Sequence, residues 1–177
     1  EFYNACKDVG IKPIIGCELY TAPTTIYEKS AATKSSGHIV LLSKTTAGYH
    51  NLLKLASIAA TDGLYYKPRI DMDLLKKYHE GIICLSACLQ GDIPAKLLAG
   101  DKEGAYAKAQ ELKDIFGEDF YIELQYHGLE DQKKVLFPLI QLAKALDIQL
   151  VATNDVHYVE KKDAFAQRVL MCMSMGK

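Results

Sequence analysis

Short apolar segments alternate with helix-patterned segments along the whole chain, and this alternation constrains the fold most strongly. The apolar segments are too short for helices and are expected to be strands, at about 13–20, 38–42, 82–85, 120–124 and 150–153. Helices are expected at about 1–10, 46–60, 71–78, 92–99, 102–116 and 131–146, with another from about 163. Alternating strands and helices predict an α/β fold with a parallel sheet that is buried on both faces.

One long loop and the absence of glycine-rich motifs add to this prediction. Residues 23–37 are rich in Thr, Ser, Ala and Lys without any period, which predicts a long, mobile surface loop. The chain contains neither GxGxxG nor GxxxxGK[ST], which argues against nucleotide binding through those loops. Strands without a glycine-rich phosphate loop favour a section of a barrel over a dinucleotide-binding sheet.

Composition excludes several classes of protein. The chain has 177 residues, 49% of them hydrophobic and 24% charged, which is typical of a globular domain. No apolar run approaches the ~20 residues that span a bilayer, so no membrane partner is expected. A net charge of −1 lacks the overall basic field of a free-standing nucleic-acid-binding protein. The 5 cysteines show no disulfide framework and no secretory signal is visible, which favours the cytoplasm.

Polar residues at the carboxyl ends of the expected strands are candidates for a functional site, because active sites of α/β barrels lie at that edge. Glu18 ends the first apolar run, Cys88 follows the third strand, and Asp155 and His157 follow the fifth. Asp155 and His157 are two residues apart, so in an extended chain they project to the same side. A carboxylate and an imidazole aimed at one point suit zinc, manganese or iron. The alternative is a hydrogen-bonded pair that caps the next helix.

The residues alone leave the other candidates open. Glu18 can equally cap a neighbouring segment, and Cys88 can be a small buried hydrophobic side chain. His38 precedes its strand, so the strand-end rule does not select it. The chain has no CxxC pair and no GxSxG motif, which argues against a closed zinc ribbon and against a serine hydrolase.

A patch of mixed aromatic and cationic residues, YYKPR at 65–69, is a further candidate. One interpretation is that Lys67 and Arg69 contact a phosphate or that the tyrosines stack a base. The alternative, which composition favours, is a rigid and exposed turn.

Five short stretches are more specific in combination than any one of them. In order, they are GIKPIIGCE at 10–18, HIVLL at 38–42, GLYYKPRID at 63–71, LSAC at 85–88 and ATNDVHY at 152–158. Together they resemble the PHP (polymerase and histidinol phosphatase) domain of the alpha subunit of bacterial DNA polymerase III. The resemblance covers essentially the whole chain.

The resemblance implies a distorted (β/α)₇ barrel, similar to a TIM barrel, with a metal cluster at the carboxyl ends of its strands. Matched position by position, the implied metal ligands are Glu18, His38, Cys88, Asp155 and His157. The family's first ligands lie in a His-x-His motif and a Thr-Asp-His-Gly motif, which this chain lacks. We therefore expect residues 1–177 to be a PHP fragment cut at both ends. The first strands and ligands would lie upstream, and the polymerase palm and fingers downstream.

The resemblance also implies a function. The parent protein would be a DNA-directed DNA polymerase, a nucleotidyltransferase of DNA replication, whose polymerisation residues lie outside this chain. The chain's own chemistry would be metal-dependent phosphodiester hydrolysis, as in a 3′–5′ exonuclease. Implied cofactors are zinc or manganese at the PHP site and magnesium at the polymerase site. Implied partners are DNA, dNTPs, a sliding clamp and a proofreading subunit.

Two alternatives to this function stay open. One is a stand-alone PHP phosphoesterase that acts on a small ester such as histidinol phosphate. The other is a non-catalytic scaffold domain that binds a proofreading partner.

Overall fold

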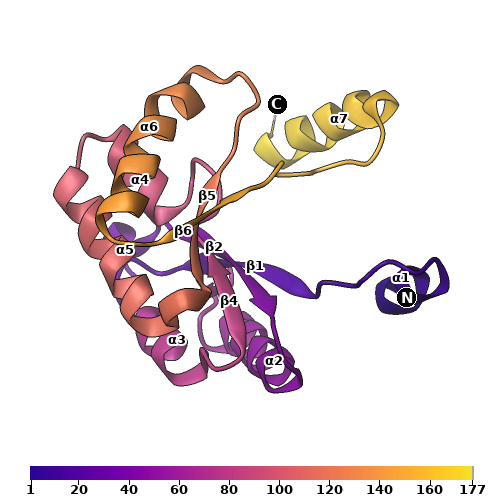
Figure 1. The fold of residues 1–177 in the computed structure, drawn as a ribbon, viewed down its shortest axis with the longest axis horizontal. Coiled ribbons are helices and arrows are strands. Elements are labelled where there is room, and N and C mark those ends of the chain that lie inside the picture. Colours follow the sequence, from indigo (N-terminus) through magenta and orange to yellow (C-terminus); the bar gives the residue numbers. More distant parts are fainter. Residues whose placement is uncertain (177) are drawn as a thin grey trace.

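The computed structural model describes residues 1–176, which form one sheet and a set of surrounding helices (Figure 1). The strands are β1 Gly16–Thr21, β2 Gly37–Ser43, β3 Arg69–Ile70, β4 Ile82–Leu85, β5 Phe120–Leu124 and β6 Gln149–Ala152. The helices are α1 Phe2–Asp8, α2 Thr46–Thr61, α3 Met72–Tyr78, α4 Asp92–Leu98, α5 Lys102–Phe116, α6 Glu130–Ala145 and α7 Ala164–Met175. The predicted α/β class is confirmed. Lys177 lies outside the described residues.

The sheet is mixed, so the prediction of a parallel sheet was wrong for one strand. The order is β3-β1-β2-β4-β5-β6, and β2 runs antiparallel to both β1 and β4, whereas the other neighbours are parallel. Parallel neighbours need a crossover connection, usually a helix. The long connection from β1 to β2 holds only a 3₁₀ helix, Ala31–Thr33, and no α-helix, and β2 runs back beside β1. The start of β2 therefore lies at the edge where β1 and β4 end.

The core lies between the sheet and the helices that pack on one of its faces. Leu19, Leu41, Cys84 and Ile122 alternate along the strands toward this face, and α2, α5 and α6 cover it. Fully burying one such aliphatic side chain contributes about 1.5–3 kcal/mol. Because side chains alternate along a strand, the residues between them point to the opposite face. That opposite face carries the candidate ligands Glu18 and His38.

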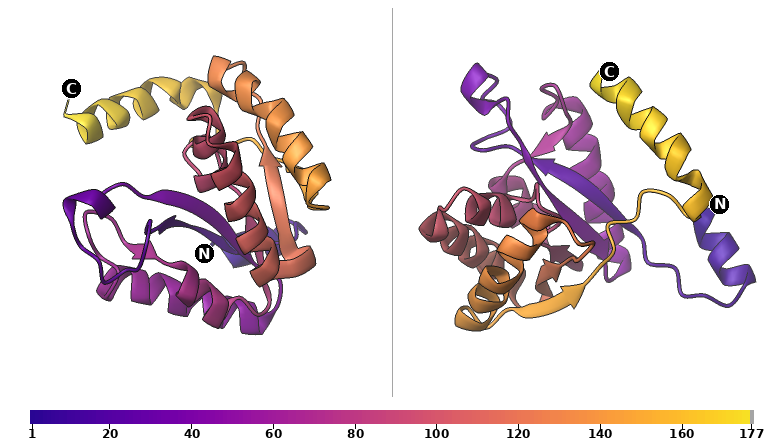
Figure 2. Two further views of the ribbon diagram at one scale, coloured as in Figure 1. Left: turned by 90° about the vertical axis from the view of Figure 1, so that its left-hand side faces the viewer. Right: turned by 90° about the horizontal axis from the view of Figure 1, so that it is seen from above.

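Helices α1 and α7 contribute no buried residue to this core. In Figures 1 and 2 both project from the body of the domain, α1 in indigo and α7 in yellow. Within residues 1–176, no helix is both long and apolar enough to cross a membrane.

The loop that joins β1 to β2, predicted to be a mobile surface loop, is held to the body at two points. The side chain of Ile26 is 1% exposed and that of Thr33 is 3% exposed. The carboxylate of Asp71 accepts a hydrogen bond from the Ile26 amide at 2.9 Å, and also caps α3 by accepting from the Leu74 amide, as predicted. The carbonyl of Thr33 accepts a hydrogen bond from Arg69 Nη1 at 2.8 Å.

Arg69 is fully buried, so its predicted contact with a phosphate was wrong. Its guanidinium donates to the carbonyls of Thr33 and Gly63 and lies over the ring of Tyr65. Sequence could not distinguish this buried cation from an exposed one, because a cation beside aromatic residues occurs in both settings. Arg69 therefore anchors the loop between β1 and β2 instead of facing solvent.

We predict that Arg69→Met, which keeps the bulk but removes the donors, loosens this loop. A hydrogen bond from a charged donor is worth about 1.5–3 kcal/mol. The open loop should therefore become about 10-fold more populated, or more. Limited trypsin digestion followed by mass spectrometry should show faster cutting after Lys29. Lys67→Met serves as the control, because it removes a neighbouring cation that does not hold the loop. An unchanged rate after Lys29 in Arg69→Met would contradict the anchoring role.

Candidate metal centre

Three of the five predicted ligands lie side by side on the sheet face away from the helices. His38 Nε2 is 3.2 Å from Cys88 Sγ and 3.9 Å from Glu18 Oε1. His38 is buried, whereas about half of the Glu18 side chain is exposed. The imidazole of His38 thus lies beside a thiol and a carboxylate that come from two other segments.

The reversed direction of β2 produces this meeting. In the β1–β2 ladder, Glu18 lies opposite Val40, and Val40 lies opposite Leu85 on β4. His38, two residues before Val40, consequently reaches the edge where β4 leads into Cys88. The strand-end rule failed to select His38 because the rule assumes that all strands are parallel. Glu18 was also placed incorrectly, since it lies inside β1 and not at its end.

Asp155 and His157 follow β6, but the backbone at Asp155 is not extended as the prediction assumed. Asp155 adopts a left-handed conformation, with φ of 47°, which breaks the extended alternation that the prediction assumed. The ring Nδ1 of His157 lies 2.8 Å from the backbone oxygen of Asp155. Both residues are exposed. The structure thus turns the His157 ring back onto the main chain.

The charge of Asp155 nevertheless reaches the cluster. Burial raises the pKa of the Cys88 thiol, and the negative charges of Asp155 and Glu18 raise this pKa further. A hydrogen bond from the backbone of Gln90 acts in the opposite direction. Without a metal ion the thiol is therefore held in its protonated form, and metal binding through sulfur would release that proton.

The donor types fit a divalent metal ion, although the set is incomplete. Imidazole, thiolate and carboxylate together suit zinc, and imidazole with carboxylate suits manganese. Among residues 1–176, no three His, Cys, Asp or Glu side chains are arranged closely enough around one point to hold a metal ion. His38 instead contacts Cys88 directly, and the Glu18 carboxylate lies 3.9 Å from the His38 ring.

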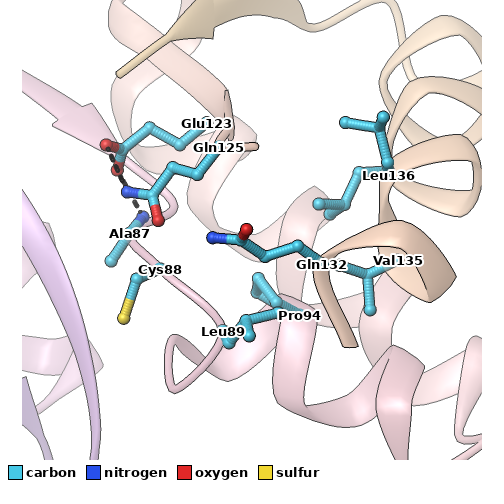
Figure 3. Close-up of a pocket in the computed structure, with 10 residues that line it drawn as sticks. Ala87, Cys88, Leu89, Pro94, Glu123, Gln125, Gln132, Val135 and Leu136 are labelled. Atoms are coloured by element: carbon cyan, nitrogen blue, oxygen red, sulfur yellow. Dashed lines mark hydrogen bonds between the residues drawn. The ribbon is translucent and has the colours of Figure 1, made fainter. Parts of the chain in front are cut away.

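A small cavity lies behind Cys88, between the 87–89 loop, the end of β5 and α6 (Figure 3). Its volume is about 10 Å³, which leaves room for roughly one water molecule. Gln125 Oε1, which lines it, is buried and has no hydrogen-bond partner among the described residues. A nucleotide cannot enter this cavity.

Glu123, which lines the same cavity, was missed in the sequence. Its side chain is 4% exposed, and one carboxylate oxygen accepts a hydrogen bond from the Ala87 amide at 2.7 Å. The signal that could have found it is a carboxylate inside an apolar strand, which is rarely buried without partners.

Lys67, unlike Arg69, lies at the surface beside the cluster. Its Nζ is 4.0 Å from the centroid of the Tyr20 ring, and Tyr20 makes an edge contact with the His38 ring at 6.3 Å between centroids. A cation is thus held next to the candidate ligands.

Comparison with known proteins identifies the family of the chain. The family model for the PHP domain matches residues 1–127. The chain belongs to the PHP domain family. The match includes Glu18, His38 and Cys88, whereas Asp155 and His157 lie beyond it.

This PHP domain is also similar to curated proteins along its whole length. It is 47% identical to the DNA polymerase III subunit alpha of Treponema pallidum, over 100% of this chain and 15% of that protein. It is 47% identical to that of Borreliella burgdorferi, over 99% of the chain and 16% of that protein. It is 43% identical to the subunit of Thermus aquaticus, over 98% of this chain and 14% of that protein. The chain thus spans about 15% of the length of these relatives.

We predict that Asp155→Asn lowers the pKa of the Cys88 thiol in the metal-free PHP domain. The carboxylate disfavours the thiolate, so its removal favours ionisation. Alkylation of Cys88 by iodoacetamide, followed by peptide mass spectrometry across pH 6 to 10 (about the range in which thiols titrate), should shift to lower pH.

Asp147→Asn is the matched control, because Asp147 is also exposed and left-handed, and asparagine tolerates that conformation. The Cys88 profile of this control should stay where it is. If Asp155→Asn left the profile equally unmoved, Asp155 would be too far from the cluster to serve it.

Proposed function

We propose that this chain is the metal-binding PHP domain of a DNA polymerase III alpha subunit and that it hydrolyses phosphodiester bonds. The observation that carries the proposal is that His38 lies 3.2 Å from Cys88 and 3.9 Å from Glu18. They come from three segments, and the resemblance had assigned all three as ligands. A 3′–5′ exonuclease is the activity that such a site would give a polymerase.

The residues of this chain would have different roles at the site. His38 Nε2, Cys88 Sγ and the carboxylates of Glu18 and Asp155 would hold zinc or manganese, and His157 would join them after its ring turns from the main chain. A bound divalent metal would lower the pKa of a water molecule that it binds and would neutralise charge on the phosphate. Lys67, held against Tyr20, would contact a substrate phosphate. Further ligands would come from the His-x-His and Thr-Asp-His-Gly motifs outside this chain.

The proposed complete fold is the distorted (β/α)₇ barrel of the family, of which residues 1–177 form a part. Helices cover one face of the sheet, and the candidate ligands lie on the other. A barrel places its helices outside in the same way. Strands from beyond this chain would close the barrel, with the palm and fingers in separate domains.

The activity of the whole protein is likewise a proposal. Relatives named DNA polymerase III subunit alpha share 40–47% identity with this chain. We therefore expect a cytoplasmic, DNA-directed DNA polymerase that uses magnesium, binds DNA and dNTPs, and works with a sliding clamp and a proofreading subunit. These names favour a polymerase over a stand-alone phosphoesterase.

A scaffold domain without catalysis is the second candidate function. It is favoured by the direct contact between His38 and Cys88 and by the His157 ring, which faces its own main chain. In that case the cluster would stabilise the domain by its contacts alone.

The experiment compares full-length Asp155→Asn, Cys88→Ser and the control Asp147→Asn. Elemental analysis measures the bound zinc and manganese. We expect the affinity for both metals to fall at least about 10–100-fold in the first two variants, because loss of a residue that only orients a ligand already weakens metal binding by that factor. Nuclease rate should fall with it. Primer extension should change much less, because its carboxylates would lie in another domain. Metal content equal to the control in both variants would overturn the metal site and favour the scaffold.

A further inference from the structure

Glu123 is a buried carboxylate that has no cationic partner. It lies near the end of β5, between β4 and β6, and its side chain is 4% exposed. No Lys, Arg or His among the described residues comes within ion-pair distance of it. A buried carboxylate is costly unless hydrogen-bond donors compensate it. Its partners therefore show what holds it in place.

Those partners come from the two segments that flank β5. Glu123 Oε2 accepts from the Ala87 amide at 2.7 Å, and Oε1 accepts from the Thr153 hydroxyl at 2.6 Å. Ala87 is the residue before Cys88, and Thr153 is two residues before Asp155. One carboxylate thus binds both segments that carry candidate ligands, as Figure 3 shows for Ala87.

The backbone conformation of the two segments that Glu123 joins is unusual. Ala87, with φ of 64°, and Asp155, with φ of 47°, occupy the left-handed region that residues with a Cβ rarely adopt. Such conformations persist only where the surroundings enforce them. The backbone adds a second tie, because the Glu123 amide donates to Ser86 Oγ at 2.8 Å. The direction of the Cys88 side chain therefore depends on groups that Glu123 holds.

We propose that Glu123 is a positioning residue that fixes the distance between the Cys88 and Asp155 segments, so that both face one metal ion. The inference rests on the proposed function. We assign Glu123 no ligand role, because it is buried and its two oxygens bond to the segments before Cys88 and Asp155. It acts through Ala87 on one side and Thr153 on the other.

The test uses the full-length protein loaded with cobalt(II), whose thiolate charge-transfer band reports a bond to Cys88. Glu123→Ala should weaken cobalt binding about 10–100-fold, as loss of an orienting partner does, and should shift the band. Thr153→Val removes the hydroxyl that bonds to Glu123 and should also weaken cobalt binding. Thr153→Ser keeps the hydroxyl and should bind cobalt as the unmodified protein does.

Asp71→Ala is the matched control, because Asp71 is also a buried carboxylate that accepts two backbone amides but joins no ligand segment. It should cost stability yet leave the band in place. Hydrogen exchange of metal-free protein gives a second readout. Glu123→Ala should speed exchange at Ala87 and at 154–157, and Asp71→Ala at Ile26 and Leu74.

The outcomes separate the two proposals. If the unmodified protein shows no band that Cys88→Ser abolishes, the proposed metal site falls, and this inference falls with it. If that band exists but both Glu123→Ala and Thr153→Val keep the affinity and spectrum of Asp71→Ala, only the positioning role is overturned. If Glu123→Ala loses exchange protection throughout the domain, the variant has unfolded. The comparison of cobalt binding by Thr153→Val and Thr153→Ser then decides whether the positioning role holds.

Discussion

Because β2 runs against both of its neighbours, its first residues lie where β1 and β4 end, and the candidate centre depends on this reversal. His38 reaches Cys88 and Glu18 only in this direction. A parallel β2 would place His38 at the opposite edge of the sheet. The connection between β1 and β2 is long, although antiparallel neighbours need only a short hairpin, and it contains no α-helix. That connection then needs anchors, and Arg69 and Asp71 supply them.

Arg69 and Glu123 solve the same physical problem with opposite charges. Each is buried without an oppositely charged partner among the described residues, and each bonds to backbone groups of loops, although Arg69 Nη2 has no partner and Glu123 also accepts from the Thr153 hydroxyl. An ion pair would satisfy only the two side chains, whereas these contacts fix segments of main chain that have no regular structure. Removing either side chain would leave buried amide or carbonyl groups unpaired, at about 1–3 kcal/mol each. Buried charged side chains therefore help to order the main-chain segments around the ligands.

Periodicity predicted most helices and strands because it reports burial, which packing then enforces. It carries no information on strand direction, so the antiparallel β2 was missed, and β3, Arg69–Ile70, is too short to show a period. In the site, residue types and order pointed to Glu18, His38 and Cys88 through a family resemblance. The burial of Arg69 was not predictable, since it follows from a contact with the distant residue Thr33, and no sequence pattern marked the left-handed turn at Asp155.

The electrostatics of the cluster connect its metal-free form to the role proposed for it. Glu18 and Asp155 place negative charge around Cys88, and burial adds to their effect on the thiol pKa. Ionising that thiol in isolation would add a third negative charge to a partly desolvated site, so the proton stays. A divalent cation reverses this balance, because each charge that opposes the thiolate attracts the metal. The features that keep the metal-free cluster protonated are thus the ones that would favour a divalent ion, provided that the segments of Cys88 and Asp155 stay in place.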